Sequence, residues 1–148
     1  MTHARVSVEV DAPAEKVWEV IANPRNLPQW DRHIAKVEGV PTNGLVKGSE
    51  YSARMRFMGV GVRVDAEVLD IDPPRYAKVR LRGLIEATVQ TTVTSLGNGR
   101  SRLEQEVDYR FRGGPLGRMA TRALRVTGGP HLILRRGTVA QKRQAEGR

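Results

Sequence analysis

The sequence predicts an α+β fold in which one antiparallel sheet curves around a C-terminal helix. Two observations predict this class. Between residues 35 and 111, apolar and polar side chains alternate with period two, which is typical of antiparallel strands that bury one face and expose the other. Apolar residues recur instead with helical spacing in residues 13–34 and again after residue 115. The expected order is therefore a strand, two short helices, six strands and a long helix.

The N-terminal part carries start and stop signals for one strand and two helices. Alternating valines predict a strand over Arg5–Val10. Pro13, with an acidic residue two positions later, is typical of the first turn of a helix. This helix is expected to end at Asn23-Pro24, because the residue before a proline avoids the α region. A second short helical segment is expected over Asn26–Ile34.

Six strands are expected in the alternating region, joined by hairpins. Turn chemistry separates them, most clearly at Gly97-Asn98-Gly99, where glycine and asparagine accept the positive φ of a tight hairpin. The expected strands are Lys36–Val40, Tyr51–Phe57, Val62–Val68, Ala77–Leu81, Ile85–Val93 and Leu103–Phe111.

The last element is expected to be a basic amphipathic helix. Gly113-Gly114-Pro115 ends the sheet and starts this helix, in which apolar side chains and arginines occupy opposite faces. We expect Gly128-Gly129-Pro130 to kink the helix, because a proline removes a helical hydrogen bond and its ring clashes with the preceding turn. A second helical segment then runs toward Lys142.

One helix is too narrow to cover such a sheet. A helix is roughly 10 Å wide, whereas neighbouring strands are about 4.8 Å apart, so six strands span far more than one helix. The sheet must therefore curl around the helix, and space remains between the two. This surplus of width predicts a cavity.

Length and composition suit a single domain over residues 1–148. Of the 148 residues 39% are hydrophobic, which is enough for one core but not for two. The absence of cysteine excludes disulfides, a thiolate nucleophile and cysteine-based metal sites. The three histidines have no metal-ligand spacing, and the sequence has no P-loop and no dinucleotide-binding loop before a helix. We therefore expect neither a metal nor a cofactor.

The net charge of +9 arises entirely in the last part of the chain. Residues 1–109 hold equal numbers of basic and acidic side chains, whereas residues 110–148 hold ten basic side chains and one acidic residue, Glu146. A solvated helix face is the usual explanation for such charge. Nucleic-acid binding is not expected, because no helix-turn-helix, zinc finger or aromatic-rich basic strand accompanies the charge.

The sequence shows no signal for a membrane or for export. No apolar run approaches the roughly 20 residues that span a bilayer. Residues 1–11 also lack the apolar stretch of a signal peptide. We therefore expect a soluble cytoplasmic protein, either a monomer or a homodimer.

Five short motifs stand out along the expected elements. They are Ala12-Pro13-Ala14-Glu15-Lys16-Val17-Trp18, Asn23-Pro24, Leu27-Pro28-Gln29-Trp30, Gly48 and Asp72-Pro73-Pro74-Arg75. With the order of elements, they resemble the START-related (Bet v 1-like, SRPBCC) superfamily, and more narrowly its bacterial polyketide cyclase/dehydrase and lipid-transport family. The resemblance implies a helix-grip fold, with an apolar cavity between the curved sheet and the last helix. Members of the superfamily bind lipids, polyketides, quinones and hormones, and a few perform chemistry.

The side chains turned toward this cavity are the candidate ligand-binding residues. Those from the sheet are Tyr51, Met55, Phe57, Val62, Val64, Leu81, Val89, Thr91, Gln105 and Tyr109, and those from the last helix are Leu116, Met119, Ala120 and Ala123. No carboxylate or histidine lies in the middle of a strand on this face, so general acid–base catalysis lacks its usual residues. An ordinary phenol, with a pKa near ~10, is a reluctant acid. The pattern favours binding over catalysis, and an enzyme of the polyketide cyclase or dehydratase type stays open as the alternative.

Alternate hairpins of an antiparallel meander lie at the same end of the sheet, and this predicts where the cavity opens. The turns at Met58–Gly61 and Arg82–Leu84 lie at the same end of an antiparallel meander as the junction that follows Phe111. An apolar mouth is expected there, ringed by arginines. Such a ring suits an amphiphile with an anionic head, or docking on an acidic carrier protein or an anionic membrane surface. The expected rim residues are Arg56, Arg82, Arg112 and Arg118.

Three functions therefore stay open. The first is binding or transfer of a hydrophobic or amphipathic small molecule of the lipid, polyketide or quinone type. The second is a polyketide cyclase, aromatase or dehydratase that folds a poly-β-keto chain into a reactive conformer by proximity. The third is an interaction module that grips a partner with its basic C-terminal helix. A void in the interior favours the first two, and a filled interior favours the third.

Overall fold

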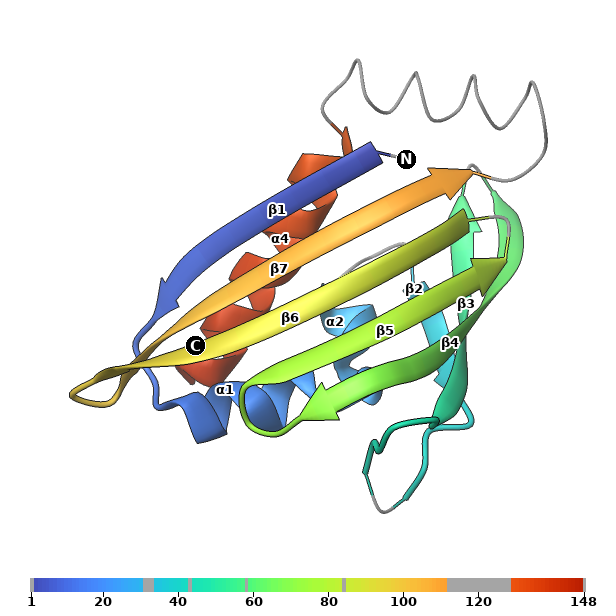
Figure 1. Cartoon of the computed structure of the whole chain (residues 1–148). Coiled ribbons are helices and arrows are strands. Elements are labelled where there is room, and N and C mark those ends of the chain that lie inside the picture. Colours follow the sequence, from blue (N-terminus) through green and yellow to red (C-terminus); the bar gives the residue numbers. More distant parts are fainter. Residues whose placement is uncertain are drawn as a thin grey trace.

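The computed structural model describes residues 2–30, 34–42, 44–57, 59–83, 85–111 and 129–147. Seven strands form one antiparallel sheet in the order β1-β7-β6-β5-β4-β3-β2. The described helices lie together on one face of this curved sheet (Figure 1). The predicted α+β helix-grip architecture is therefore confirmed, with the predicted order of a strand, short helices, a six-stranded meander and a C-terminal helix.

The elements have the following bounds. The strands are β1 (Thr2–Val10), β2 (Ile34–Glu38), β3 (Glu50–Phe57), β4 (Val60–Asp72), β5 (Tyr76–Gly83), β6 (Ile85–Gly97) and β7 (Arg100–Phe111). The helices are α1 (Ala14–Ile21), a 3-10 turn (Pro24–Asn26), α2 (Leu27–Trp30) and α4 (Gly129–Ala145). The kink predicted at Gly128-Gly129-Pro130 involves the preceding segment, residues 112–128, which lies outside the described residues.

The predicted second strand, Lys36–Val40, starts two residues later than the observed strand β2, which starts at Ile34. Ile34 belongs to β2 rather than to a helix, and it pairs with Met55 of β3. Its half-buried side chain contributes to the interior, so packing against the sheet overrides the weak helical pattern of this short segment. The strand ends at Glu38 rather than at Val40, because Gly39 has a φ of +77°, which glycine adopts without strain.

The hairpin between β6 and β7 has the backbone that its sequence predicts. Gly97, Asn98 and Gly99 have φ values of +81°, +55° and +72°. Glycine and asparagine tolerate this left-handed region better than other residues do. The turn thereby fixes the register of the two strands that it joins, in which Thr91 lies opposite Gln105.

The best-packed part of the core lies where α1 meets the sheet. Val10, Val17 and Leu103 are completely buried there. The Ser101 hydroxyl donates a hydrogen bond of 2.7 Å to the carbonyl oxygen of Ala12, which satisfies a polar group at this depth. Because α1 is held against β6 and β7, the chain that follows it is directed toward the rest of the interior.

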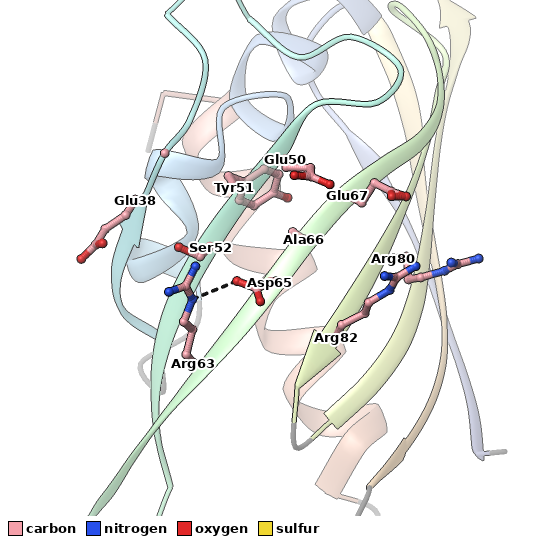
Figure 2. Close-up of a pocket in the computed structure, with 11 residues that line it drawn as sticks. Glu38, Glu50, Tyr51, Ser52, Arg63, Asp65, Ala66, Glu67, Arg80 and Arg82 are labelled. Carbon is pink, nitrogen blue, oxygen red and sulfur yellow. Dashed lines mark hydrogen bonds and ion pairs between the residues drawn. The ribbon is translucent and has the colours of Figure 1, made fainter.

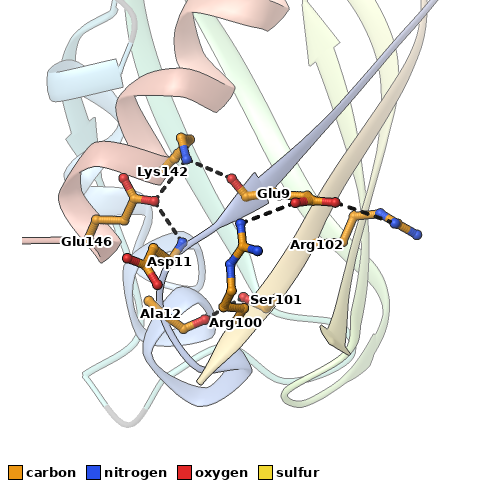
Figure 3. A network of polar contacts seen from close by, with 8 residues as sticks. All are labelled: Glu9, Asp11, Ala12, Arg100, Ser101, Arg102, Lys142 and Glu146. Atoms are coloured by element: carbon orange, nitrogen blue, oxygen red, sulfur yellow. Dashed lines mark hydrogen bonds and ion pairs between the residues drawn. The ribbon is translucent and has the colours of Figure 1, made fainter. Parts of the chain in front are cut away.

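Polar contacts tie the end of α4 to the junction between β1 and α1 (Figure 3). The Glu146 carboxylate accepts a hydrogen bond of 2.7 Å from the backbone N–H of Asp11 and one of 2.9 Å from the Lys142 ammonium. The same ammonium donates at 2.7 Å to the carbonyl oxygen of Glu9. The side chain of Glu146 is only 4% exposed, so this junction is shielded from solvent screening. It fixes the last helix over the sheet.

Replacing Glu146→Ala should therefore lower the free energy of unfolding by about 2 kcal/mol, since the Asp11 N–H and the Lys142 ammonium lose a charged, buried partner. The measurement is urea denaturation followed by circular dichroism. Glu19→Ala removes the same side chain from an exposed position on α1 and should change stability by less than about 0.5 kcal/mol. Equal stability losses in the two variants would contradict the assigned role of Glu146.

Candidate functional site

A cavity of about 250 Å³ lies between the sheet and the helices. Its wall combines the inward-facing rows of β3 to β7 with side chains from α1, α2 and α4. The lining residues are Trp18, Ile21, Ala22, Pro24, Leu27, Trp30, Ile34, Leu45, Tyr51, Ala53, Met55, Val64, Ala66, Ile71, Ala77, Val79, Leu81, Val89, Thr91, Gln105 and Gln141.

Small side chains keep this space open. Ala53, Ala66 and Ala77 occupy inward positions on three successive strands, where a larger residue would reach into the void. A cavity of about 150 Å³ lined by apolar residues is large enough to hold benzene, so the space here suits a molecule of about two fused rings. The sheet is wider than the helices that cover it, and the space that results is not filled by side chains.

The structure brings half of the predicted ligand-binding residues to the cavity wall. They are Tyr51, Met55, Val64, Leu81, Val89, Thr91 and Gln105. Val62 and Tyr109 are not part of the wall, although Tyr109 is buried. The side chain of Phe57, together with Leu116, Met119, Ala120 and Ala123, lies outside the described residues. Contact between any of these side chains and a ligand stays a prediction.

The end at which the cavity was expected to open is only partly described. Phe57 pairs with Val60, and Ile85 pairs with Phe111, so the β3–β4 and β5–β6 turns share one end of the sheet with the end of β7 (Figure 1). Of the four predicted rim arginines, Arg56 and Arg82 are exposed near this end. The other two, Arg112 and Arg118, lie outside the described residues, so the ring of arginines stays a prediction.

Sequence reasoning missed several wall residues. Ala77 and Val79 alternate with charged residues just as the predicted neighbours do, so the period-two pattern contains the signal for them. Trp18 and Trp30, which the sequence analysis did not name as ligand-binding residues, also line the cavity. The indole N–H of Trp30 donates at 2.9 Å to Gln144 Oε1, which joins α2 to α4.

Gln141 was missed because it lies on the last helix, far from the sheet in sequence. On α4, Thr138, Gln141 and Ala145 are buried and follow one another at intervals of three and four residues. This spacing places them on one helix face. The buried face of this helix therefore carries polar groups, which an apolar pattern cannot reveal.

Hydrogen bonds connect these polar groups across the interior. The Thr138 hydroxyl donates to Gln105 Oε1 at 2.9 Å, and Gln105 Nε2 donates to Gln141 Oε1 at 2.9 Å. The Thr138 hydroxyl also donates to the carbonyl oxygen of Leu134 at 2.8 Å, so its single proton is shared between two acceptors. No side chain in this chain of bonds is ionised, and the residues Thr138, Gln105 and Gln141 are no more than 7% exposed. The cavity thus has one polar end, formed where α4 faces β7.

Tyr51 supplies a second polar group to the wall. Desolvation by burial raises the pKa of its hydroxyl from 10.0 to about 12, so this group remains a neutral hydrogen-bond donor at any physiological pH. In the register of the sheet Tyr51 lies opposite Ala66, and Ala66 lies opposite Leu81. Tyr51 also lines a second, polar hollow together with Glu50 and Glu67, so this residue lies between the cavity and that hollow.

The described part of the cavity wall holds no charged side chain. None of the lining residues described here is an aspartate, glutamate, lysine, arginine or histidine. Across the described ranges, no group of three histidine, cysteine, aspartate or glutamate residues is arranged to hold a metal ion. Within the same ranges, no helix has the length and apolar character needed to cross a membrane.

A second hollow, of about 430 Å³, is polar and has a different character (Figure 2). Its charged side chains come from outward positions of β3, β4 and β5 and from the end of β2, and they include both signs. Arg63 forms an ion pair of 2.9 Å with Asp65 inside it. Because opposite charges lie beside one another on an open surface, this hollow is well suited to water. The charged residues are Glu38, Glu50, Arg63, Asp65, Glu67, Arg80 and Arg82.

Solved structures share this architecture over nearly their whole length. The Zhui aromatase/cyclase from Streptomyces sp. R1128 is 20% identical, with a TM-score of 0.73 over 99% of this chain and 92% of that one. A START superfamily protein from Mycobacterium smegmatis is 17% identical, with a TM-score of 0.73 over 98% and 97%. The protein TTHA0849 from Thermus thermophilus is 13% identical, with a TM-score of 0.76 over 97% of both chains. At these identities the likeness shows the fold alone.

Sequence comparison shows the family. No curated protein matches the chain. The family model described as polyketide cyclase/dehydrase and lipid transport matches residues 1–131, which is most of the chain. The narrower resemblance found in the sequence is thereby confirmed: the protein belongs to the polyketide cyclase/dehydrase and lipid-transport family.

Proposed function

We propose that this protein binds a hydrophobic or amphipathic small molecule in the cavity between the sheet and the helices, and carries or transfers it. The observation that supports this most is the apolar void of about 250 Å³, whose described wall holds no charged residue. Burial of ligand surface in such a void is favourable by roughly 25 cal/mol per Å². Family membership supports either hydrophobic ligand binding or polyketide cyclase activity, and the wall favours binding.

A polyketide cyclase is the second candidate, and Tyr51 is the observation that favours it. A poly-β-keto chain could fold within the cavity while the Tyr51 hydroxyl donates a hydrogen bond to one of its carbonyl oxygens. Proton transfer by this hydroxyl is unfavourable, because its pKa of about 12 is far above neutral pH. Such a cyclase would act through shape and positioning, so binding is still the first requirement.

The interaction-module alternative has less support. It needs a filled interior, and the cavity is a void large enough for a small molecule. An acidic carrier protein or an anionic membrane surface fits better as the source of the ligand. Arg56 and Arg82 are exposed near the predicted mouth, and within the described residues neither forms an ion pair with a carboxylate. They are therefore free to attract an anionic surface.

Filling the cavity should abolish binding without unfolding the protein. Ala77→Phe places a ring in the void, so the affinity for 2-naphthol, an uncharged fluorescent probe of two fused rings, should fall roughly ten-fold or more. Probe titration followed by fluorescence measures this. Ala35→Phe introduces the same ring at an exposed position of β2 and should leave affinity unchanged. Equal affinities in the Ala77→Phe variant and the unmodified protein would refute the proposed function.

The buried phenol should make stability depend on pH in the alkaline range. Because the pKa of Tyr51 is about 12 in the folded protein and 10.0 without burial, the unfolded chain loses this proton first as pH rises. The contribution of Tyr51 is thus complete below pH 10 and is lost between pH 10 and 12. At pH 12 this loss amounts to roughly 2 kcal/mol.

Comparison with the Tyr51→Phe variant isolates this contribution from other titrating groups. Between pH 10 and 12 the variant should lose about 2 kcal/mol less stability than the unmodified protein, as measured by urea denaturation. Parallel stability curves for the two proteins across this range would show that the hydroxyl is not desolvated.

A further inference from the structure

The hydrogen bonds at the polar end of the cavity run in one direction. The Thr138 hydroxyl donates to Gln105, and Gln105 donates through its amide nitrogen to the carbonyl oxygen of Gln141. The acceptor of Gln141 is thereby used, and its Nε2 group, which only donates, is left at the end of the chain of bonds. Among the described residues, the hydrogen bond found for the Gln141 side chain is the one that its Oε1 accepts. The geometry therefore presents a donor to the cavity.

Two hydroxyls add to this donor. Thr91 lies opposite Gln105 in the sheet and is 9% exposed, and Tyr51 lies further along the wall. Within the described part of the chain, neither hydroxyl has a side-chain hydrogen-bond partner. Both side chains line the cavity, so their hydroxyls are available to hydrogen-bond to a polar group of a ligand placed there.

The same wall would reject a charged ligand. Every described lining residue is uncharged, so a carboxylate or an ammonium placed there would lose its water without gaining a counterion. The polar side chains of the wall form hydrogen bonds to a neutral oxygen of the ligand, mainly as donors. These bonds replace the hydrogen bonds that the oxygen loses with water. The cavity volume of about 250 Å³ limits the ring system to about two fused rings.

We propose that the ligand is an uncharged molecule of about two fused rings whose oxygen accepts a hydrogen bond from the side-chain amide of Gln141. Thr91 hydrogen-bonds to the same polar end of the ligand, and the apolar body lies against the alanine and valine rows of β3, β4 and β5. This inference rests on the proposed binding function and adds the chemical class of the ligand to it.

Three probes with one ring system test the class. Naphthalene, 2-naphthol and 2-naphthoate differ in having no oxygen, a neutral oxygen and a charged carboxylate. Isothermal titration calorimetry on the full chain at neutral pH should give an affinity for 2-naphthol roughly five-fold higher than for naphthalene, the gain expected of one net hydrogen bond. The affinity for 2-naphthoate should be lower than for either of the other probes.

Variants assign the preference to particular side chains. Gln141→Leu should reduce the affinity for 2-naphthol to the level of naphthalene while leaving naphthalene binding unchanged. Thr91→Val keeps the shape of the wall and should reduce the preference for 2-naphthol in part. Gln29→Leu is the matched control at an exposed position of α2 and should preserve the preference. Circular dichroism on each variant checks that it is folded.

The outcomes separate this inference from the proposed function. Binding of 2-naphthoate at least as tight as that of 2-naphthol, or a preference for 2-naphthol that survives in both Gln141→Leu and Thr91→Val, overturns the inference and leaves the cavity as a general apolar binding site. Failure of all three probes to bind overturns the proposed function as well.

Discussion

The structure depends on a mismatch of widths between a seven-stranded sheet and the helices that cover it. Strands about 4.8 Å apart and a helix roughly 10 Å wide cannot be matched by flat packing, so the sheet curves around the helices. Curvature alone does not leave a void, because large side chains could fill the space. Here Ala53, Ala66 and Ala77 fall on inward positions of neighbouring strands, and the void survives between them and the helices. The cavity is therefore a property of both the topology and the choice of small residues.

The two regions of the interior serve different purposes. Under α1 the side chains of Val10, Val17 and Leu103 are completely buried, and this packing stabilises the fold. The contacts of Glu146 with Asp11 and Lys142 hold the end of α4 beside that core. Further along the sheet lies the cavity, whose wall includes hydroxyls and amides. Such groups are unfavourable in a void unless something satisfies them, which agrees with the proposed binding of a ligand in this part of the interior.

Much of the fold could be predicted from sequence because period-two alternation is a direct consequence of strand geometry. The same alternation identified Val64, Leu81 and Thr91 as inward-facing, and all three line the cavity. Gln141 could not be found in this way, because its position over Gln105 depends on how the last helix lies across the sheet. Ile34 was assigned to a helix because a short segment carries too little periodicity, and its pairing with β3 decides its structure. Local pattern thus predicted the sheet well, whereas contacts between distant elements had to come from the structure.

We have proposed that a ligand binds in the space between the sheet and the helices. Nuclear magnetic resonance of the ¹⁵N-labelled protein, recorded during titration with naphthalene, locates the binding site residue by residue. We expect chemical-shift changes concentrated at the amides of Ala77, Val89 and Thr91, whose side chains line the cavity, with little change at exposed positions such as Thr94. Changes confined to exposed residues, or no changes at concentrations that saturate comparable apolar cavities, would contradict it.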